Sequence, residues 1–465
     1  MTKLNLRGKD LQRIGFADDR AMSVAKNIML KYYKHQSKEE ALEILKKVHK
    51  NPGKFINHPQ LGKIAEVLQE KVKSQRKISV NLDQQKPYKI YGKENIEKGA
   101  LDQMATAMQL PISLRGALMP DAHQGYGLPI GGVLATKNEV IPYGVGMDIG
   151  CRMCMSVYDL EVDQIYKNET RLKNLLTENT RFGNAEFRGS KNHPIFERPE
   201  LNEIEFLRTL KKKAHEQLGS SGHGNHFVDI GILEIKEYIP EHDLQPGKYF
   251  TILSHSGSRG PGAEIARHYT KIAMDKCDLP KGARALAWLD LSREEGIEYW
   301  KAMNWAGDYS AANHHVIHEK LSEALGNKPL AMMENHHNFA WKEKLHTDET
   351  AIIHRKGATP AHKDVLGIIP GSMATPGYLV RGKGSEEALN SAAHGAGRVM
   401  SRSQAKKQFQ VKELQELLNE KGVVLIGGGL DESPLAYKDI NEVMHLQDDM
   451  VEILAEFKPK IVRME

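Results

Sequence analysis

The histidines of this sequence are concentrated in one part of the chain, and several of them lie in short turns rich in glycine and serine. Fourteen of the 21 histidines lie between residues 223 and 394. Examples of such turns are GSSGHGNHF at 219–227, SHSGSRG at 254–260 and HGAGRVMSR at 394–402. Imidazole binds divalent metals and transfers protons near neutral pH, and loops that a rigid sheet positions often carry active sites. The pattern therefore points to a metal site or to histidine-based catalysis.

A carboxylate and a thiol that could complete a metal site lie close together in the segment YGVGMDIGC (143–151). Asp148 and Cys151 are three residues apart in a glycine-rich turn, so both side chains can point to one centre and can join histidines in a mixed site. Cys151 and Cys154 also form C-x-x-C, half of a zinc ribbon, but the second half is missing because Cys277 stands alone. A thioredoxin-like pair is the alternative, although the flanking Gly-Met-Asp-Ile-Gly does not favour it. We treat Asp148 and Cys151 as candidate ligands and expect Cys154 and Cys277 to be small buried residues.

A basic segment near the C-terminus has the residue types for phosphate chemistry. Residues 371–407 contain six Lys or Arg against two Glu. His394, Arg398 and Arg402 are spaced by four, so on a helix they share one face, and the two glycines that follow the histidine would let backbone N–H groups approach a phosphate. A neutral histidine beside two arginines suits a nucleophile that attacks a phosphorus whose oxygens the arginines hold. The alternative is a plain basic helix surface.

Other candidate signatures are weaker. His314 and His318 lie four apart on a predicted helix, but no HExxH is present, and we favour a solvated helix face over a metal pair. Residues 377–383 nearly make a P-loop, but Gly384 replaces the Ser or Thr that would bind magnesium. The chain contains no Asp-Gly dipeptide, so the Lys-x-Asp-Gly site of ordinary polynucleotide ligases is absent.

Residues 1–85 read as a helical accessory region. Ser37 and Glu40 form a capping-box pattern. Apolar residues at helical spacing follow over 41–48, and Asn-Pro-Gly at 51–53 ends the helix.

Residues 86–465 have a different texture, in which glycine-rich loops separate apolar runs. Strand-like runs at 131–134, 249–253 and 423–426 alternate with helical patterns at 261–277 and 387–407. This mixture predicts one α+β domain that positions the candidate residues on loops at strand ends.

Composition narrows the class of protein. The chain has 465 residues, a formal net charge of +5 and three cysteines, which cannot build a disulfide scaffold. It contains no apolar run of about 18 residues that would predict a membrane-spanning helix, and its first residues lack the apolar region of a signal peptide. We expect a cytoplasmic enzyme with no membrane association. The total charge gives little evidence for or against binding of nucleic acid.

The motifs resemble those of the RtcB family of RNA ligases over residues 86–465, and they occur in that family's order. The matching segments are MPDAHQGYGLPIGGVLAT (119–136), YGVGMDIGC (143–151), GNHF (224–227), SHSGSRG (254–260), HHN (336–338), HRKGAT (354–359), PGSM (370–373), HGAGRVMSR (394–402) and AYKDI (436–440). The resemblance implies an α+β fold, with a single RtcB-like catalytic domain and a helical N-terminal extension.

The resemblance also implies an activity. RtcB enzymes join RNA ends with a 2′,3′-cyclic phosphate or a 3′-phosphate to 5′-hydroxyl ends, in tRNA splicing or RNA repair. They use GTP and two Mn²⁺ ions, and act through a guanylylated histidine and an RNA-(3′)pp(5′)G intermediate. The implied partners are RNA with such ends and an archease-type activator.

Residue roles follow from the resemblance position by position. The guanylylated histidine matches His394, and arginines that the chemistry requires match Arg259, Arg398 and Arg402. The metal ligands match Asp148, Cys151, His226, His255 and His337, with the cysteine bridging two ions. The nucleotide contacts match Asn225, Phe227, Asp229, Ser372, Gly395, Ala396, Gly397, Tyr437 and Arg463.

Two positions depart from the family pattern. Asp229 stands where the family usually has Glu at the guanine edge. Arg463 stands in place of a lysine that, in the family, lies near the C-terminus and touches guanine. Arginine and lysine are not equivalent at a shaped contact, so these departures weaken the expectation of a strict GTP preference.

Two other functions remain as alternatives. A metal-dependent phosphoesterase or RNA 3′-end-modifying paralogue would use the same ligands without ligation, and a non-catalytic paralogue would only bind RNA. His394 favours the ligase, since hydrolysis alone has no use for a nucleophile beside Arg398 and Arg402.

Overall fold

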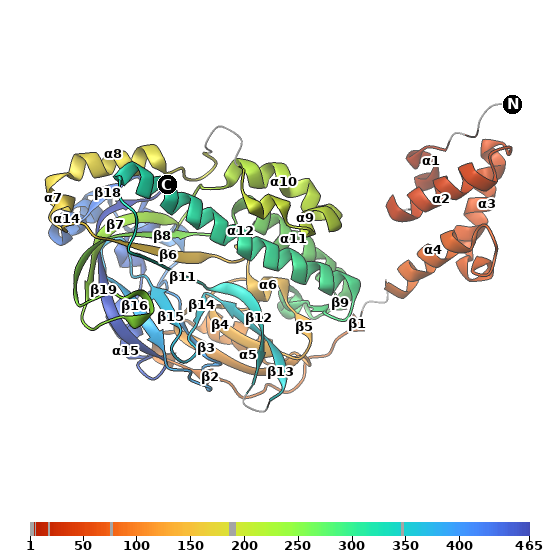
Figure 1. The fold of residues 1–465 in the computed structure, drawn as a ribbon. Helices are drawn as coiled ribbons and strands as arrows, with labels where there is room; N and C mark the ends of the chain where they lie inside the picture. The colour runs from red at the N-terminus through yellow and green to blue at the C-terminus, as the bar shows by residue number, and fades with distance from the viewer. Residues whose placement is uncertain (1–3, 5, 17–18, 75–77, 186–191, 346–347) are drawn as a thin grey trace. The chain divides into compact units, whose positions relative to one another are not determined.

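The computed structural model describes residues 4, 6–16, 19–74, 78–185, 192–345 and 348–465. The chain divides into two compact units, Met1–Ser79 and Val80–Glu465, and each is described by itself (Figure 1). The functional boundary at residue 85 stays a prediction.

The first unit is helical. Its elements are α1 (Gly8–Arg13), α2 (Asp19–Tyr32), α3 (Lys38–Lys50), the 3-10 turn η1 (Pro52–Phe55), α4 (Gly62–Ser74) and the short strand β1 (Ile78–Ser79). The predicted capping box is confirmed, because Ser37 Oγ accepts from the Glu40 backbone N–H at 3.2 Å and Glu40 Oε2 accepts from that of Ser37 at 2.8 Å. Leu11, Phe16 and Leu45 are fully buried in an apolar core that belongs to this unit alone.

The second unit is built on two sheets, which together with its helices confirm the α+β prediction. The larger sheet has the order β11-β6-β8-β7-β19-β16-β15, with β18 beside β19, and the smaller has the order β12-β13-β4-β3-β2. Their strands are β2 (Lys89–Ile90), β3 (Ser113–His123), β4 (Ile130–Thr136), β6 (Arg152–Tyr158), β7 (Phe227–Ile235), β8 (Gly247–Ser256), β11 (Ala331–His336), β12 (Asn338–Lys344), β13 (Thr350–Lys356), β15 (Leu366–Ile369), β16 (Gly377–Gly382), β18 (Val424–Ile426) and β19 (Val451–Arg463). Shorter strands are β5 (Glu139–Val140), β9 (Cys277–Asp278), β10 (Leu289–Asp290), β14 (Ala358–Pro360) and β17 (Ser391–Ala393).

Helices cover one face of the larger sheet. Figure 1 shows α8, α10, α11 and α12 along the side of β6, β7 and β8. The helices of this unit are α5 (Lys98–Ala107), α6 (Pro142–Val145), α7 (Gln164–Lys167), α8 (Glu169–Asn179), α9 (Glu200–Glu203), α10 (Glu205–Gln217), α11 (Arg259–Lys276), α12 (Glu294–Leu325), α13 (Arg402–Gln408), α14 (Val411–Lys421) and α15 (Ile440–His445). The 3-10 turns are η2 (Lys93–Asn95), η3 (Pro194–Glu197), η4 (Pro240–His242), η5 (Lys281–Leu286), η6 (Leu430–Glu432) and η7 (Pro434–Ala436). Among the described residues, no helix is both long and apolar enough to cross a membrane.

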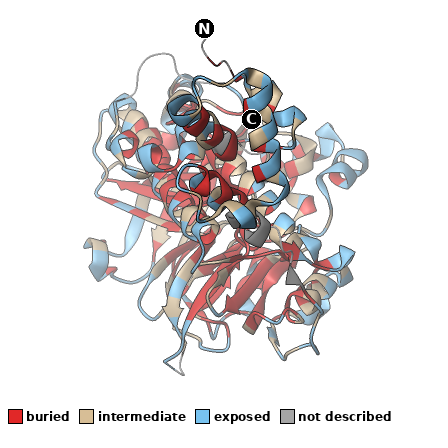
Figure 2. Cartoon of the chain, turned by 90° about the vertical axis from the view of Figure 1, so that its right-hand side faces the viewer, coloured by how far each residue is buried: buried red, intermediate tan, exposed pale blue. Residues whose placement is uncertain are grey.

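Consecutive residues of the central strands point to opposite faces of the larger sheet. Tyr158 and Phe250 belong to the core that also contains Ile317 of α12, whereas Met155 and Leu253 belong to a different core. This follows from the two-residue period of a strand. Figure 2 shows the buried residues concentrated in the strands and in the inner sides of the helices. The alternation decides which side chains of β6 and β8 face the candidate site.

One predicted helix is wrong. Residues 387–407 do not form a continuous helix, because β17 is followed by an irregular loop and α13 begins only at Arg402. Gly397 has φ +72°, and a Cβ there would lie 2.1 Å from the backbone oxygen of Asp121, so this close approach excludes a side chain. His394 and Arg398 therefore lie on a loop and do not share a helix face with Arg402.

Candidate active site with metal-ligating residues

A cavity of about 1190 Å³ opens at the ends of the central strands of the second unit. Its walls come from the loop before β6, the starts of β7 and α13, the loop after β17 and the end of β19. The motifs that carried the resemblance thus meet in one place, although they are far apart in the sequence.

Five potential metal ligands lie together at this cavity, and we name them the cavity cluster. They are Asp148, Cys151, His226, His255 and His337. Cys151, His255 and His337 form one group of donor atoms within 4.8 Å of one another, and Asp148, Cys151 and His226 form a second. Cys151 belongs to both groups, so its sulfur could bridge two cations.

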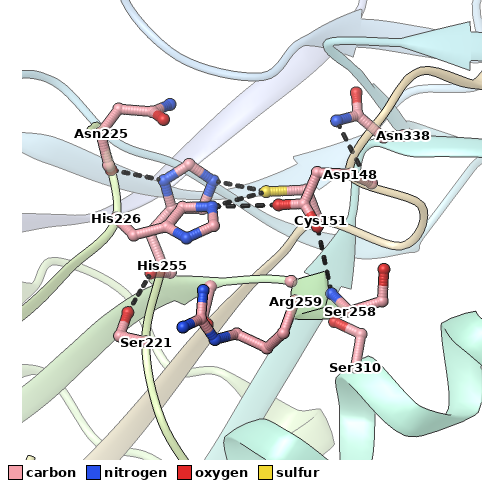
Figure 3. A network of polar contacts seen from close by, with 12 residues as sticks. Asp148, Cys151, Ser221, Asn225, His226, His255, Ser258, Arg259, Ser310 and Asn338 are labelled. Atoms are coloured by element: carbon pink, nitrogen blue, oxygen red, sulfur yellow. Dashed lines mark hydrogen bonds and ion pairs between the residues drawn. The ribbon is translucent and has the colours of Figure 1, made fainter. Parts of the chain in front are cut away.

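The distances within the cavity cluster are short. Cys151 Sγ lies 3.1 Å from His255 Nε2 and 3.5 Å from His226 Nε2. His226 Nε2 lies 3.1 Å from Asp148 Oδ2, and His255 Nε2 lies 3.2 Å from His337 Nε2. Figure 3 shows the thiol and the carboxylate directed toward the imidazoles of His226 and His255.

Strand register brings these ligands together. Cys151 directly precedes β6 and His226 directly precedes β7, while His255 lies in β8 between those two strands, paired with Met153 and with Phe227. Close backbone approach completes the arrangement. A Cβ at Gly257 would lie 2.2 Å from a carboxylate oxygen of Asp148, so only glycine fits there.

Neighbouring groups fix the orientation of the ligands. The backbone oxygen of Asn225 lies 2.9 Å from His255 Nδ1, so that nitrogen donates and Nε2 keeps its lone pair for the cavity cluster. The Ser258 backbone N–H donates to Asp148 Oδ1 at 3.1 Å. Such bonds hold a ligand in place before a cation binds.

Burial controls the protonation of the cavity cluster. It lowers the pKa of His255 to about 3 and holds that of His337 well below its usual range, so both rings are neutral donors. Burial, reinforced by the charge of Asp148, raises the pKa of Cys151. Burial also acts to raise the pKa of Asp148, but the contact with His226 outweighs it and the net shift is downward. The thiol therefore becomes a thiolate ligand only when a cation binds and the proton is released to solvent.

His394 lies beside the cavity cluster and has a carboxylate behind it. Its ring centroid is 4.9 Å from that of His337. Its Nδ1 lies 2.6 Å from Asp121 Oδ2, which also accepts the His394 backbone N–H at 3.2 Å. Asp121 is fully buried. With Nδ1 donating to this carboxylate, Nε2 is left with its lone pair.

Glu432 ties two arginines to the cavity wall. Arg398 Nη1 lies 3.1 Å from Glu432 Oε2, and Arg402 Nε lies 2.9 Å from Glu432 Oε1. The Tyr437 hydroxyl also donates to this carboxylate, and the Arg398 guanidinium lies 5.0 Å from the centroid of the Tyr437 ring. Arg402 donates to Asn225 Oδ1 at 3.3 Å. One carboxylate for two guanidinium groups leaves this wall positive, which suits a phosphate.

Most of the predicted nucleotide contacts line the same cavity. These residues are Asn225, Phe227, Asp229, Ser372, Gly395, Ala396, Gly397 and Tyr437. Asp229 is buried, its Oδ1 has no hydrogen-bond partner, and burial raises its pKa well above the usual range. A buried carboxyl oxygen without a partner fits a ligand that brings a donor.

Comparison with known proteins identifies the family. The model of the family described as tRNA-splicing ligase RtcB matches residues 103–205 and 197–465. The chain belongs to the RtcB family. It is similar to the RNA-splicing ligase RtcB of Escherichia coli K12, with 33% identity over 391 residues, 77% of this chain and 92% of that protein. It is also similar to the tRNA-splicing ligases RtcB of Nanoarchaeum equitans, with 31% identity (81% of this chain, 94% of that protein), and of Methanococcus maripaludis, with 30% (77% and 89%).

Two residues that the RtcB pattern led us to expect at the site do not line the cavity. Arg259 donates from Nη2 to the Gly183 backbone oxygen at 2.5 Å and from Nε to Ser220 Oγ at 3.3 Å. Its backbone has φ +57°, an unusual conformation for a non-glycine residue that concentrates at functional sites. Arg259 therefore lies next to the cavity cluster, as Figure 3 shows, without reaching the cavity surface.

Arg463 is the second such residue, and the period of its strand explains why. Val462 and Met464 line the cavity, so Arg463 between them points to the other side of β19. Its Nε donates to Thr180 Oγ1 at 2.7 Å, and its guanidinium lies 5.5 Å from the centroid of the Phe182 ring. Arg463 therefore does not line the cavity, and its expected contact with guanine stays a prediction.

Two residues important for this arrangement were not predicted from the RtcB motifs. Asp121 lies in the matching segment 119–136, so the motif contained the signal, but its distance of 273 positions from His394 hid the pairing. Glu432 lies outside every motif that we used, and only the fold reveals its contacts.

A second set of histidine and cysteine donors lies on the opposite face of the sheet, and we name it the helix-side cluster. It consists of Cys154, His314 and His318. The prediction of a solvated helix face for the two histidines is wrong, because they are 0% and 2% exposed against the sheet. The predicted burial of Cys154 and Cys277 is confirmed.

Proposed function

We propose that this RtcB-family RNA ligase joins RNA ends that carry a 2′,3′-cyclic phosphate or a 3′-phosphate to 5′-hydroxyl ends, in tRNA splicing or RNA repair. The observation that carries the proposal is His394, whose Nδ1 is bound to the buried Asp121 and whose ring lies beside the cavity cluster. A nucleophile fixed in this way next to metal ligands is suited to covalent transfer of a nucleotide.

The cavity cluster fits two divalent cations, and we propose Mn²⁺. Its donors form two groups that share Cys151, and burial lowers the pKa of His255 and of His337, which keeps those two imidazoles neutral. Bound cations would hold phosphate oxygens and offset the charge that develops at the phosphorus. A mixed nitrogen, oxygen and sulfur site favours zinc over manganese in affinity, so excess zinc should inhibit the enzyme.

The first chemical step that we propose takes place at His394. Asp121 accepts the hydrogen bond from Nδ1–H and stabilises the positive charge that the ring gains, while Nε2 attacks the α-phosphorus of GTP. A phosphorus–nitrogen bond forms, the bond to the bridging oxygen breaks, and pyrophosphate leaves. Arg398 and Arg402 line the same cavity and can bind phosphate oxygens.

The later steps transfer GMP to RNA and then release it. Water opens a cyclic phosphate to the 3′-phosphate, whose oxygen attacks the phosphorus of the histidine-bound GMP and regenerates His394. This gives RNA-(3′)pp(5′)G. The 5′-hydroxyl then attacks the 3′-phosphorus, a phosphodiester forms and GMP leaves.

Phe227, Asp229, Ser372 and Tyr437 are the side chains that we propose to contact guanosine. The Asp229 oxygen without a partner is placed to bind a guanine N–H. We leave out Arg463, because its side chain points away from the cavity. We retain Arg259 as a residue that would position the loops beside the cavity cluster, through its bonds to Ser220 and to the backbone of Gly183.

Covalent labelling tests the proposal. The protein would be incubated with GTP labelled at the α-phosphorus and with Mn²⁺, and the label retained after denaturation would be measured. We expect an acid-labile label that His394→Ala abolishes. Absence of label with GTP and with every other nucleotide would overturn the proposal, and phosphate release from RNA ends without label would favour the phosphoesterase. Ligation with and without an archease-type protein tests the predicted activator.

A further inference from the structure

The small total charge of the chain hides a strong separation of charge between its two units. The unit Met1–Ser79 contains 18 Lys and Arg against 8 Asp and Glu, a formal net charge of +10. The unit Val80–Glu465 contains the remaining 47 against 52, a net charge of −5. The unit that carries the candidate active site is thus net negative, although the proposed substrate is a polyanion.

Exposed cations of the first unit gather in two short segments. Lys46, Lys47, Lys50 and Lys54 are exposed at the end of α3 and in η1, within nine residues that contain no acidic side chain. Lys31, Lys34 and Tyr32 are exposed at the end of α2. Tyr32 is 47% exposed, and Lys31 Nζ lies 5.0 Å from its ring centroid.

Few of these cations are compensated. Within the described part of Met1–Ser79, the ion pairs join Lys38 to Asp10 at 2.8 Å and Lys46 to Glu43 at 3.7 Å. The second is a long pair between side chains that are 63% and 64% exposed, which contributes little attraction. Asp10 and Glu40 also accept backbone N–H groups at helix starts, so their charge is already engaged.

Folding of the unit does not explain the charge. Its core is apolar and self-contained, with Leu11, Phe16 and Ile64 fully buried. Cations in the last turn of a helix interact favourably with the helix dipole, which accounts for three lysines, Lys31 in α2 and Lys47 and Lys50 in α3. A net charge of +10 exceeds that need and favours an anionic partner.

We propose that Met1–Ser79 is an RNA-binding unit that holds the substrate of the attached catalytic unit. The exposed lysines would neutralise phosphates, and Tyr32 would offer a face for a base to stack on. Lysine contacts of this kind do not read base edges, so binding should depend on salt far more than on sequence. This inference rests on the proposed function, because RNA is the polyanion that function requires.

Charge reversal in the full-length chain tests the inference. The variant combines Lys46→Glu, Lys47→Glu, Lys50→Glu and Lys54→Glu, and its affinity for a fluorescent RNA with a 3′-phosphate is measured by anisotropy over a range of salt concentrations. We expect affinity to fall about tenfold or more, and the slope of log affinity against log salt to shrink by about 0.7 for each lost phosphate contact. The KM for RNA should rise to match.

A matched variant controls for net charge. It combines Lys167→Glu, Lys212→Glu, Lys344→Glu and Lys412→Glu, four exposed positions of the catalytic unit that do not line the cavity. Both variants change the net charge by the same amount, and the helical circular dichroism of both should equal that of the wild type. Equal loss of RNA affinity in the two variants would overturn the inference, since it would show a nonspecific effect of charge.

A stacking variant and a readout without RNA complete the test. Tyr32→Ala should weaken RNA binding about fivefold. Covalent labelling of His394 needs no RNA, so it should be unchanged in the charge-reversed protein. If the wild type binds RNA but takes no label, the proposed function is wrong and the RNA-binding inference still stands. The RNA proposal would be overturned if neither Tyr32→Ala nor the fourfold lysine-to-glutamate variant changed RNA affinity. Salt-sensitive binding of an acidic protein in that case would assign the surface to a protein partner.

Discussion

The cavity cluster and the helix-side cluster use the same kinds of side chain on opposite faces of the same strands. Cys151 directly precedes β6, and its side chain meets that of His255 in β8 on the cavity side. Cys154 lies within β6, opposite Ser254 of β8, and both face α12. The C-x-x-C spacing therefore separates the two thiols, since positions three apart in an extended strand point to different faces.

Hydrogen bonding and access distinguish the two clusters. His318 is bonded at both nitrogens, to Ser156 Oγ at 2.7 Å and to Ser254 Oγ at 2.8 Å, and His314 Nδ1 lies 2.7 Å from the same Ser254 oxygen. The helix-side cluster contains no carboxylate and does not line the cavity. Ligand types at suitable distances are thus insufficient; a metal site also needs donor atoms that are free and can be reached.

The largest effect that separates the clusters should come from their cysteines. Cys151→Ala removes the sulfur that both donor groups share, so we expect the His394 label to fall by more than about a hundredfold. Cys154→Ala should leave labelling largely intact. Labelling rates and bound manganese per chain measure both variants. An equal loss in the two would show that the helix-side cluster holds the catalytic ion.

The next largest effect on labelling should come from a substitution of Asp121. His394 is bonded at Nδ1 to this buried carboxylate, whereas the histidines of the helix-side cluster are bonded to serine hydroxyls. Asp121→Asn keeps the shape but removes the negative charge, and its amide can donate to Nδ1 and so favour the other tautomer of His394. We expect labelling to slow by about a hundredfold or more, with little change in GTP affinity. A rate within twofold of wild type, measured in single-turnover labelling, would show that Asp121 does not position the nucleophile.

How much of this could be predicted from the sequence depends on the range of the interactions. The capping box at Ser37 and the burial of Cys154 follow from local patterns, and both were predicted correctly. The helix over 387–407 was predicted wrongly because a close contact between Gly397 and Asp121 outweighs a helical pattern. The pairing of Asp121 with His394 needs the folded chain. His314 and His318 were misassigned because polar residues on a helix were taken to be exposed, whereas serines of the sheet bond both nitrogens of His318 and Nδ1 of His314.

The helix-side cluster should affect stability in acid. Burial lowers the pKa of His318 to about 3 from 6.5, so below pH 6.5 the unfolded chain binds a proton that the folded chain excludes. Stability is therefore fully present above pH 6.5, and falls as the pH drops toward 3, by up to about 1.4 kcal/mol per pH unit for this group. His318→Asn removes this dependence, and denaturant unfolding of both proteins from pH 7 to 4 measures the difference. The control His35→Asn changes an exposed histidine of the first unit and should leave the slope unaltered.

The smallest effect on nucleotide binding should come from a substitution of Arg463. As Cys151 and Cys154 do, Arg463 and its neighbours at the end of β19 face opposite sides of the sheet. Its neighbours Val462 and Met464 face the cavity while its own side chain contacts Thr180 on the other side. Arg463→Ala should therefore change the apparent affinity for GTP in the labelling assay by less than about twofold, and stability by about 1 kcal/mol at most. Asp229→Ala is the matched comparison, because it removes a cavity-lining carboxyl from the adjacent strand β7 and should weaken the preference for GTP over ATP about tenfold or more. A strong loss of GTP affinity in Arg463→Ala would show that the end of β19 rearranges when nucleotide binds, so that strand alternation in the free protein does not determine which residues reach the guanine.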